Sequence, residues 1–367
     1  MKIPFVDLRA QYQSIKEDID SAIESVIVRS AYIRGPFVEN FERNFAARLN
    51  MKHCIGVGNG TDAIYIVLKM LGIGAGDEVI TTAISWISTS ETISQAGARP
   101  VFVDVDPDFY TIDPSRIEEK ITKRTKAIIP VHLYGQPADI VKIKTLCDKY
   151  NLLLIEDCAQ AHFAEFEGKM TGTFGIASTF SFYPGKNLGA YGDAGAILTN
   201  NDELAMKVRM YANHGALKKH NHEFEGVNSR LDGLQAAILD AKLRYISEWT
   251  EKRIAAAGIY SSLLSGVHEI TTPKTRENCK HVFHVYNIRT ENRDRLKQIL
   301  NEAGIETAIH YPTALPNMPA YRYLSHKTSD FPVASAYQDR ILSLPIFPEI
   351  TSEQIEYVVN IINKSLS

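Results

Sequence analysis

The sequence is poor in cysteine, and its four cysteines are too widely spaced for a familiar metal or redox motif. Cys54, Cys147, Cys158 and Cys279 form no C-x-x-C pair, and they fall mostly in apolar patterns typical of strands or helices. This distribution argues against a disulfide framework and against a metal site. It suits reduced thiols in a cytosol.

Long apolar runs and an excess of positive charge are also absent. Nowhere do about 18 apolar residues follow one another, as a membrane-spanning helix would require. The opening stretch MKIPFVDLRAQYQSIKED reaches proline and acidic residues before an apolar signal segment can accumulate. The formal net charge is -3, so nothing attracts the chain to nucleic acid or to an anionic membrane. We therefore expect a cytoplasmic protein whose partner is a small molecule.

What the sequence does have is length and a regular alternation of strand-like and helix-like segments. With 367 residues, of which 45% are hydrophobic, it exceeds the size at which single cores usually split, which predicts two domains. Helix-like segments separate short β-branched runs, an order typical of α/β folds. The predicted strands are 53–58, 77–82, 99–105, 126–135, 152–160, 177–183 and 194–200, and the helices between them include 61–71, 87–96, 139–150 and 202–213.

The spacing of these segments predicts a mixed, mostly parallel sheet flanked by helices. The last two strands are too close together for a crossover helix, so we expect them to be antiparallel neighbours. We assign residues 31–245 to this large domain and residues 246–367 to a small C-terminal domain. An N-terminal helical segment, residues 1–30 with an amphipathic helix at 11–28, is expected to pack on the small domain or on a partner subunit.

The pattern changes after the helical stretch that follows residue 226, and it predicts a small α+β domain. Its expected elements are strands at 281–290 and 305–312, with a helix at 293–303 between them. A terminal helix is predicted from the capping pattern Thr351-Ser352-Glu353-Gln354. No repeats or low-complexity tracts interrupt this organisation.

A glycine-rich turn in GVGNGTDAIYIVLK (56–69) joins a predicted strand to a helix that opens at Thr61-Asp62. Free backbone N–H groups and the positive end of a helix favour an anion there, most simply a phosphate. The glycine spacing matches neither the dinucleotide fingerprint nor a Walker loop. An ordinary helix start capped by Asn59 or Thr61 is the alternative interpretation.

A second candidate element is LLLIEDCAQAH (152–162), where a nearly all-apolar strand ends in Glu156-Asp157. Ligands of open α/β sheets bind beyond the carboxyl ends of the strands. Asp157 is the better candidate, because a buried carboxylate needs a cation or several donors, and a protonated ring nitrogen would serve. The alternative is a carboxylate that caps the next turn. Gln160 and His162 either line the same crevice or satisfy backbone groups, and His162 is more typical of a packed core.

The third element is FSFYPGKNLGAYGDAGA (180–196), which contains Lys186. Aromatic and apolar neighbours would desolvate its ammonium group and lower its pKa toward nucleophilic use. Glycines at 185, 189 and 192 would let a planar ligand approach the backbone closely. An ordinary surface lysine is the alternative. The neighbours are Phe180, Phe182, Tyr183, Pro184, Leu188, Ala190 and Tyr191.

Together the three elements describe a phosphate cradle, a strand-end carboxylate and a desolvated lysine 29 residues after it. This combination matches what pyridoxal 5'-phosphate demands. A lysine holds its aldehyde, an aspartate keeps its ring nitrogen protonated, and helix-end amides hold its phosphate.

Over nearly its whole length the chain resembles the sugar aminotransferases of the DegT/DnrJ/EryC1/StrS family, which are fold-type I pyridoxal phosphate enzymes. This resemblance implies an α/β fold with a large cofactor-binding domain and a small α+β C-terminal domain. The motifs that carry it are FVDL (5–8), GNGTDA (58–63), EDCAQAH (156–162), SFYPGKNLGAYGDAG (181–195), GVNSRLDGLQAA (226–237) and HYP (310–312).

The resemblance implies a role for each residue of the cofactor site. Lys186 would be the Schiff-base lysine and proton shuttle, Asp157 would pair with the pyridinium nitrogen, and Gln160 would bond the ring hydroxyl. Trp86 would stack on the ring, unless it is an ordinary core tryptophan. The phosphate would be held by Ser181, by Thr61 and by the backbone from Gly60 to Asp62.

Further residues would serve the substrate or a second subunit. Asn228 resembles a residue that reaches the phosphate from the neighbouring subunit, which implies a homodimer with shared active sites. Arg230 would bind a glutamate carboxylate or a sugar-nucleotide phosphate, and a structural ion pair is the alternative. The resemblance places four residues on the substrate side of the site, His310, Tyr311, Tyr183 and Lys219. Lys219 lies in a polar loop at 213–226, and the alternative interpretation is that this loop is an ordinary solvated cluster of charges.

The implied reaction moves an amino group from L-glutamate, leaving 2-oxoglutarate, to a nucleotide-linked keto sugar, while the cofactor alternates between its pyridoxal and pyridoxamine forms. The segment GVNSRLDGLQAA resembles members that act at C3, and a dTDP-linked 3-keto-6-deoxyhexose is favoured. The alternatives are a UDP-linked 3-keto uronic acid or N-acetyl hexosamine, and C4 amination of a 4-keto-6-deoxy sugar nucleotide. Such amino sugars serve surface polysaccharides, including the O-antigen of lipopolysaccharide.

Three other classes fit the sequence less well. A nicotinamide-dependent dehydrogenase would use Asp77 or Glu78 for a ribose, but the glycine spacing is wrong and Lys186 would have no task. Related dehydratases resemble this chain with histidine in place of the lysine. A regulator that binds the cofactor without catalysis would carry a DNA-binding segment, and neither end of the chain offers the positive charge for one.

Overall fold

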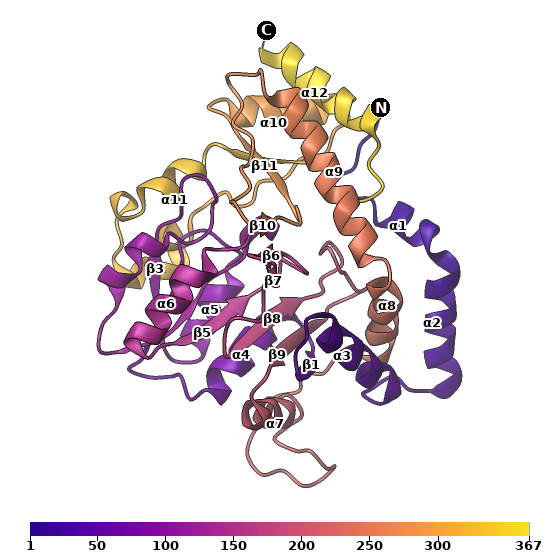
Figure 1. Cartoon of the computed structure of the whole chain (residues 1–367), viewed down its shortest axis with the longest axis vertical. Helices are drawn as coiled ribbons and strands as arrows, with labels where there is room; N and C mark the ends of the chain where they lie inside the picture. Colours follow the sequence, from indigo (N-terminus) through magenta and orange to yellow (C-terminus); the bar gives the residue numbers. More distant parts are fainter. Residues whose placement is uncertain (367) are drawn as a thin grey trace.

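The computed structural model describes residues 1–366, and within them a seven-stranded sheet lies between two layers of helices (Figure 1). Its strand order is β1-β9-β8-β5-β4-β2-β3. β9 runs antiparallel to both of its neighbours, and the pairs β5–β8, β4–β5, β2–β4 and β2–β3 are parallel. The predicted mixed sheet is confirmed. The strands are β1 (His53–Val57), β2 (Glu78–Thr82), β3 (Arg99–Val103), β4 (Thr125–Ile129), β5 (Leu153–Asp157), β8 (Ala177–Ser181) and β9 (Gly195–Thr199).

Alternate strand residues face opposite helix layers, as the two-residue period of a strand requires. In β4, Ala127 and Ile129 share an apolar core with α4 and α7, whereas Ile128 packs with α6. A third core joins β8 and β9 to α3, α8 and the N-terminal helix α2 (Lys16–Arg29). The helices are α3 (Pro36–Arg48), α4 (Gly60–Met70), α5 (Ser88–Gln95), α6 (Ile140–Tyr150), α7 (Asp202–Tyr211) and α8 (Gly233–Leu243).

The N-terminal segment contains two helices, α1 (Leu8–Ser14) and α2 (Lys16–Arg29), where the sequence predicts one. The helix breaks at Ile15, whose φ of -132° is not helical. Ile15 and Ile19 are buried in the core shared with α3 and α8, a contact that the sequence does not predict. Ile3 pairs with Ile305 of the C-terminal part, so the segment touches both parts of the chain.

The C-terminal part is built around a long helix and a two-stranded sheet. The predicted strand at 305–312 is wrong, because β11 pairs with β12 and this segment contributes just two isolated bridges, Ile305 to Ile3 and Ala308 to Ser343. The chain turns instead at His310, whose carbonyl accepts a hydrogen bond from the Tyr134 hydroxyl. The elements are α9 (Ile246–Leu264), β11 (Tyr286–Arg289), α10 (Arg293–Glu302), α11 (Pro332–Tyr337), β12 (Ile341–Leu344) and α12 (Ser352–Leu366).

The start of α12 confirms the predicted capping pattern. The Thr351 hydroxyl accepts from the Gln354 N–H at 3.2 Å, and the Gln354 side chain accepts from the Thr351 N–H at 3.0 Å. The remaining short elements are strands β6 (Glu165–Phe166), β7 (Lys169–Met170) and β10 (Cys279–Lys280), and 3-10 helices at Pro114–Arg116, Glu118–Lys120, Leu133–Gly135, Leu315–Asn317, Pro319–Leu324 and Thr328–Asp330.

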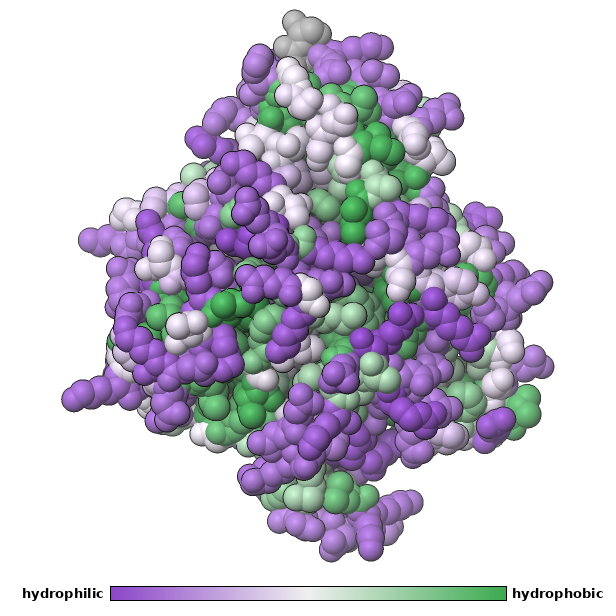
Figure 2. Space-filling model, in the orientation of Figure 1, coloured by the Kyte–Doolittle hydropathy of each residue, from purple (hydrophilic) through white to green (hydrophobic). Residues whose placement is uncertain are grey.

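The two parts of the chain share apolar surface. Leu315 and Tyr321 pack with Ala83 and Phe102 at the β2–β3 edge of the large sheet, and α9 contributes to the core near α8 and to the C-terminal core. α9 begins at Ile246, where the sequence places the start of the small domain, and that division of the chain stays a prediction. Within residues 1–366, no helix has both the length and the apolar character to cross a membrane. Figure 2 shows hydrophilic residues over much of one face.

Candidate active site

A cavity of about 560 Å³ lies beyond the carboxyl ends of β5 and β8 and brings together most of the predicted site residues. Lys186, Asp157 and the start of α4 all line it, although they are far apart in the sequence. The sheet order explains this, because β5 and β8 are neighbours and Lys186 follows β8. The other predicted residues that line it are Gly60, Thr61, Trp86, Gln160, Ser181, Tyr183, His310 and Tyr311.

Lys186 lies in a tight loop that directs it into this cavity. Its N–H donates to the carbonyl of Tyr183 at 2.8 Å. A Cβ at Gly189 would lie 2.3 Å from the carbonyl oxygen of Pro184, so only glycine allows the loop to close. Burial lowers the pKa of the Lys186 ammonium to about 8, and the nearby Asp157 carboxylate opposes that shift. The predicted desolvation of this lysine is therefore present in the structure.

Asp157 is buried, and two donors hold its carboxylate in place. The Thr89 hydroxyl donates to Oδ2 at 2.8 Å, and the Ala159 N–H donates to Oδ1 at 3.0 Å. Burial raises the pKa of Asp157, while these donors and the Lys186 ammonium oppose the rise. The bond from Ala159 is the turn cap that the sequence offers as an alternative. Since Asp157 also lines the cavity, it caps the turn and faces the cavity at once.

Glu156 points away from the cavity and organises the strand end instead. Its carboxylate accepts from the N–H groups of Gly172, Phe174 and Gly175 at 2.7 to 2.9 Å, and His132 lies 3.1 Å away. The other ring nitrogen of His132 accepts from a backbone N–H at 3.0 Å. Three side chains here lie close enough together to resemble a metal site, those of Glu156, His132 and Cys158. The hydrogen bonds just described already occupy the ligand atoms of Glu156 and His132.

The start of α4 provides the expected cradle, with one difference. The Asn59 side chain caps the helix by accepting from the Asp62 N–H at 2.8 Å. The Asp62 carboxylate accepts from the Ser229 hydroxyl at 2.6 Å, and Asp62 does not line the cavity. The first N–H groups of a helix have no intrahelical partner, and Gly60 lies so close to Ser181 that a Cβ would come within 2.7 Å of its Cβ. Gly60, Thr61 and Ser181 form the cradle.

Aromatic and polar side chains form the wall that faces Lys186. Trp86 is 60% exposed and lines the cavity, which contradicts the alternative that it is a core tryptophan. Its ring lies 6.1 Å from that of Tyr311. The Gln160 amide accepts from the Tyr134 N–H at 2.7 Å and donates to the Tyr311 hydroxyl at 2.8 Å. Burial, together with the charge of Lys186, lowers the pKa of His310 to about 4, so this imidazole is neutral.

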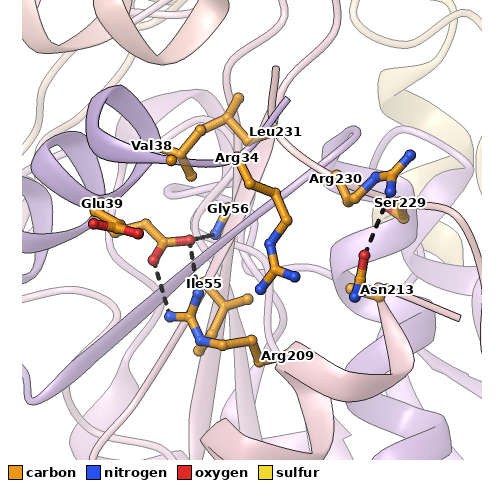
Figure 3. Close-up of a pocket in the computed structure, with 13 residues that line it drawn as sticks. Arg34, Val38, Glu39, Ile55, Gly56, Arg209, Asn213, Ser229, Arg230 and Leu231 are labelled. Atoms are coloured by element: carbon orange, nitrogen blue, oxygen red, sulfur yellow. Dashed lines mark hydrogen bonds and ion pairs between the residues drawn. The ribbon is translucent and has the colours of Figure 1, made fainter. Parts of the chain in front are cut away.

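Besides Asp62, three predicted residues do not line the cavity of their own chain. Arg230 lies in a separate small pocket beside Arg34, and its Nη1 donates to the Asn213 Oδ1 at 3.4 Å (Figure 3). Among the described residues no acidic side chain lies within 4.0 Å of Arg230, and the ion-pair alternative stays an open prediction. Asn228 bridges Asn213 in the same segment. Lys219 is exposed on the loop 213–226 that projects below α7 (Figure 1).

The sequence does not single out three ionisable residues that line the cavity, Asp193, Arg253 and His284. The Nδ1 of His284 lies 3.2 Å from the Asn187 Oδ1. His284 reaches the site because the segment between β10 and β11 crosses Gly135, where a Cβ would lie 3.0 Å from the His284 N–H nitrogen. Histidine in a strand-like pattern carries no local signal of this crossing.

The fold and the lining of this cavity define a fold-type I, pyridoxal 5'-phosphate-dependent enzyme. The sequence model of the DegT/DnrJ/EryC1/StrS aminotransferase family matches residues 13–363, and the chain belongs to this family. Homologues of the chain are named as nucleotide-sugar transaminases.

Curated relatives match over nearly their full length. The chain is 46% identical to a protein of Geobacillus stearothermophilus named pleiotropic regulatory protein, covering 98% of this chain and 97% of the relative. It is 44% identical to the dTDP-3-amino-3,6-dideoxy-alpha-D-galactopyranose transaminase of Aneurinibacillus thermoaerophilus, covering 99% of both. It is 42% identical to the UDP-2-acetamido-2-deoxy-3-oxo-D-glucuronate aminotransferase of Pseudomonas aeruginosa, covering 97% and 98%.

Solved structures agree with this assignment. The crystal structure of DesV from S. venezuelae superposes with a TM-score of 0.97 at 41% identity, covering 99% of this chain and 98% of that one. The Bacillus subtilis ntda structure with bound pyridoxamine phosphate has a TM-score of 0.91 at 32% identity, covering 100% and 85%.

The residues present fit the cofactor. The free N–H groups at Gly60 and Thr61 suit its phosphate, the buried Asp157 carboxylate suits a protonated ring nitrogen, and a lysine of lowered pKa suits its aldehyde. When bound, pyridoxal phosphate supplies a ring that withdraws electrons from the carbon carrying the transferred amine.

The lowered pKa of Lys186 predicts how fast the apoprotein takes up pyridoxal phosphate at each pH. Only a neutral amine attacks an aldehyde, and Lys186 loses its proton near pH 8 rather than near 10.5. We expect the uptake rate to rise with pH and to level off above about 8, measured by stopped-flow absorbance. Nα-acetyl-lysine, the control amine, should keep gaining rate well beyond that pH. A profile for the protein that parallels the control would contradict the buried, desolvated lysine.

Proposed function

We propose that the protein transfers the amino group of L-glutamate to C3 of a nucleotide-linked 3-keto sugar, with a dTDP-linked 3-keto-6-deoxyhexose as the favoured acceptor. The observation that carries this proposal is the full-length match to a relative named as a dTDP-3-amino-3,6-dideoxy-galactopyranose transaminase. A UDP-linked 3-keto sugar is the alternative, supported by the relative that acts on a UDP-linked 3-oxo-glucuronate. C4 amination of a 4-keto-6-deoxy sugar nucleotide is a further alternative without such support among these relatives.

In this proposal each residue of the cavity has a separate task. Lys186 would hold the cofactor covalently, and its Nζ would carry a proton between the substrate carbon that bears the amine and the cofactor carbon joined to that nitrogen. Asp157 keeps the ring nitrogen protonated, which sustains electron withdrawal. Gly60, Thr61 and Ser181 bind the phosphate, and Trp86 covers a face of the ring. Gln160, already bonded to Tyr311, is proposed to orient the ring hydroxyl.

The substrate is proposed to enter past Tyr183, which is 60% exposed at the cavity. His310 and Tyr311 would contact the sugar. The neutral state of His310 suits it to hydrogen bonding with a hydroxyl rather than to ion pairing.

We further propose a homodimer in which Asn228, Arg230 and Lys219 complete the cavity of the partner subunit. Support comes from their position, since none of them lines the cavity of its own chain. Exposed apolar side chains near the end of α2, among them Val28 at 76% and Ile33 at 53%, offer surface for such a contact. We also propose a cytoplasmic location, because the four cysteines are unpaired, and a role in amino sugars for surface polysaccharide.

Incubation of the purified protein with L-glutamate and a panel of keto sugars tests the proposed function. The panel contains dTDP- and UDP-linked 3-keto and 4-keto sugars, and mass spectrometry follows the products. We expect a yellow protein that loses its visible colour with glutamate, and an amino sugar formed fastest from the dTDP-linked 3-keto sugar. Amination of a 4-keto sugar alone, or of no member of the panel, would overturn the proposal.

A further inference from the structure

Arg253 lines the same cavity as Lys186, and no acidic side chain in the part of the chain that the structure describes forms an ion pair with it. The residue lies on α9 and is only 3% exposed. Within residues 1–366 it has no carboxylate within 4.0 Å, whereas most arginines buried in proteins are paired. Burial lowers the pKa of its guanidinium to about 10, so the group is still charged at neutral pH.

The contacts of Arg253 leave part of its guanidinium unused. Nη1 donates to the carbonyls of Ile346 at 2.9 Å and of Phe283 at 3.3 Å. The Nε proton has no partner among the described residues, although it is buried. Main-chain carbonyls orient an arginine but cancel none of its net charge, and a buried unpaired charge is costly.

The nearest acidic group does not resolve this imbalance. Glu349 opposes the fall in the pKa of Arg253, but the two side chains form no ion pair, and the Glu349 Oε2 also lacks a hydrogen-bond partner. Glu349 does not line the cavity, whereas Arg253 does. His284, beside Arg253, is kept neutral because burial and the charges of Lys186 and Arg253 lower its pKa. A negatively charged ligand in the cavity could therefore supply the counter-charge that Arg253 lacks.

We infer that Arg253 is the binding site for a carboxylate of the amino donor. A planar guanidinium matches a carboxylate in shape and charge, and a dicarboxylic amino acid brings that group to the cavity that holds Lys186. The inference rests on the proposed function and deepens it, because it assigns the donor subsite to Arg253 rather than to Arg230. Arg230 lies in a different pocket of this chain, bonded to Asn213.

A second anion, the diphosphate of the sugar nucleotide, has related chemistry. We favour the carboxylate because Arg253 is almost entirely enclosed, with two of its donor bonds already given to the main chain. A carboxylate needs fewer donors than a diphosphate and fits a nearly closed wall. Separate measurements of the binding affinity for a dicarboxylate and for a nucleoside diphosphate distinguish the two ligands.

Equilibrium binding of glutarate to the holoenzyme tests the inference without turnover. Glutarate has both carboxylates of glutamate but no amine, and dTDP and UDP are titrated in parallel. We expect Arg253→Met to weaken glutarate binding about 10- to 100-fold, which is the usual loss for a hydrogen-bonded charged partner. dTDP and UDP should bind as they do to the wild type. Arg340→Met, the matched control, removes an exposed guanidinium that pairs with Glu291 at 3.2 Å and does not line the cavity, so it should leave glutarate binding unchanged.

Arg253→Lys decides the question if the methionine variant does not fold. It keeps the positive charge but loses the planar fork, so we expect glutarate to bind about 10-fold more weakly, with the cofactor absorbance intact. Wild-type glutarate affinity in the folded Arg253 variants would overturn the inference. A loss of dTDP or UDP binding instead of glutarate binding would also overturn it. If glutarate binding depends on Arg253 but the enzyme aminates no keto sugar of the panel, the proposed substrate is contradicted and this inference still stands.

Discussion

Replacing Lys186 with alanine is expected to abolish multiple turnover, with a loss of about 10⁴-fold or more, because the residue both holds the cofactor and moves the proton. The fold should survive, because the bonds that shape the loop come from the backbone, such as the Lys186 N–H to the carbonyl of Tyr183. The variant should also lose the visible absorbance of covalently attached pyridoxal phosphate. The measurements are steady-state transfer and absorbance of the dialysed protein.

A surface lysine supplies the control for this prediction. Lys207 is exposed and pairs with Glu203 at 2.6 Å, far from the cavity lining, so Lys207→Ala should keep both the colour and the rate. Circular dichroism and thermal unfolding establish that Lys186→Ala is folded. Repeated turnover by that folded variant would contradict the assignment of Lys186.

Replacing Asp157 with asparagine is expected to lower the rate about 10²- to 10³-fold, which is the usual effect of removing one buried electrostatic group from an active site. Asparagine has nearly the same shape, but it does not stabilise a protonated ring nitrogen. Its amide also places an NH₂ group where Thr89 or Ala159 now donates. Cofactor binding should weaken only in part, because the phosphate cradle and Lys186 are unchanged.

Single-turnover kinetics with glutamate measure this effect separately from sugar binding. Asp202→Asn is a suitable control, because this exposed carboxylate pairs with Lys52 and His53 at the protein surface and does not line the cavity. We expect the control to react at the wild-type rate. A similar small effect in both variants would indicate that Asp157 acts as a turn cap and not on the cofactor.

The sheet and the centre of the site could be predicted because their signals are local. Each buried strand is a short β-branched run, and the polar groups that follow β5 and β8 stand at strand ends, where parallel neighbours converge. Gly60, Asp157 and Lys186 therefore meet as expected. Asp62 does not join them, because Asn59 takes its N–H for the helix cap, and both residues are typical of a helix start.

The rest depends on contacts between distant segments. His284 and Arg253 enter the cavity only because the C-terminal chain crosses Gly135 and α9 reaches back toward the large sheet. A lowered pKa is also not specific to the site. Burial lowers the pKa of Lys242 to about 7, yet its Nζ donates to the Gly189 carbonyl at 2.8 Å and it does not line the cavity. Only tertiary structure separates the two lysines.

Peptide mapping of the reduced holoenzyme tests the central claim most directly. Borohydride fixes pyridoxal phosphate on whichever amine carries it, and mass spectrometry of the digest then identifies that lysine. We predict one modified peptide, carrying the phosphopyridoxyl group on the Nζ of Lys186. Modification of Lys242 or of any other lysine, with the peptide around residue 186 unmodified, would contradict the account.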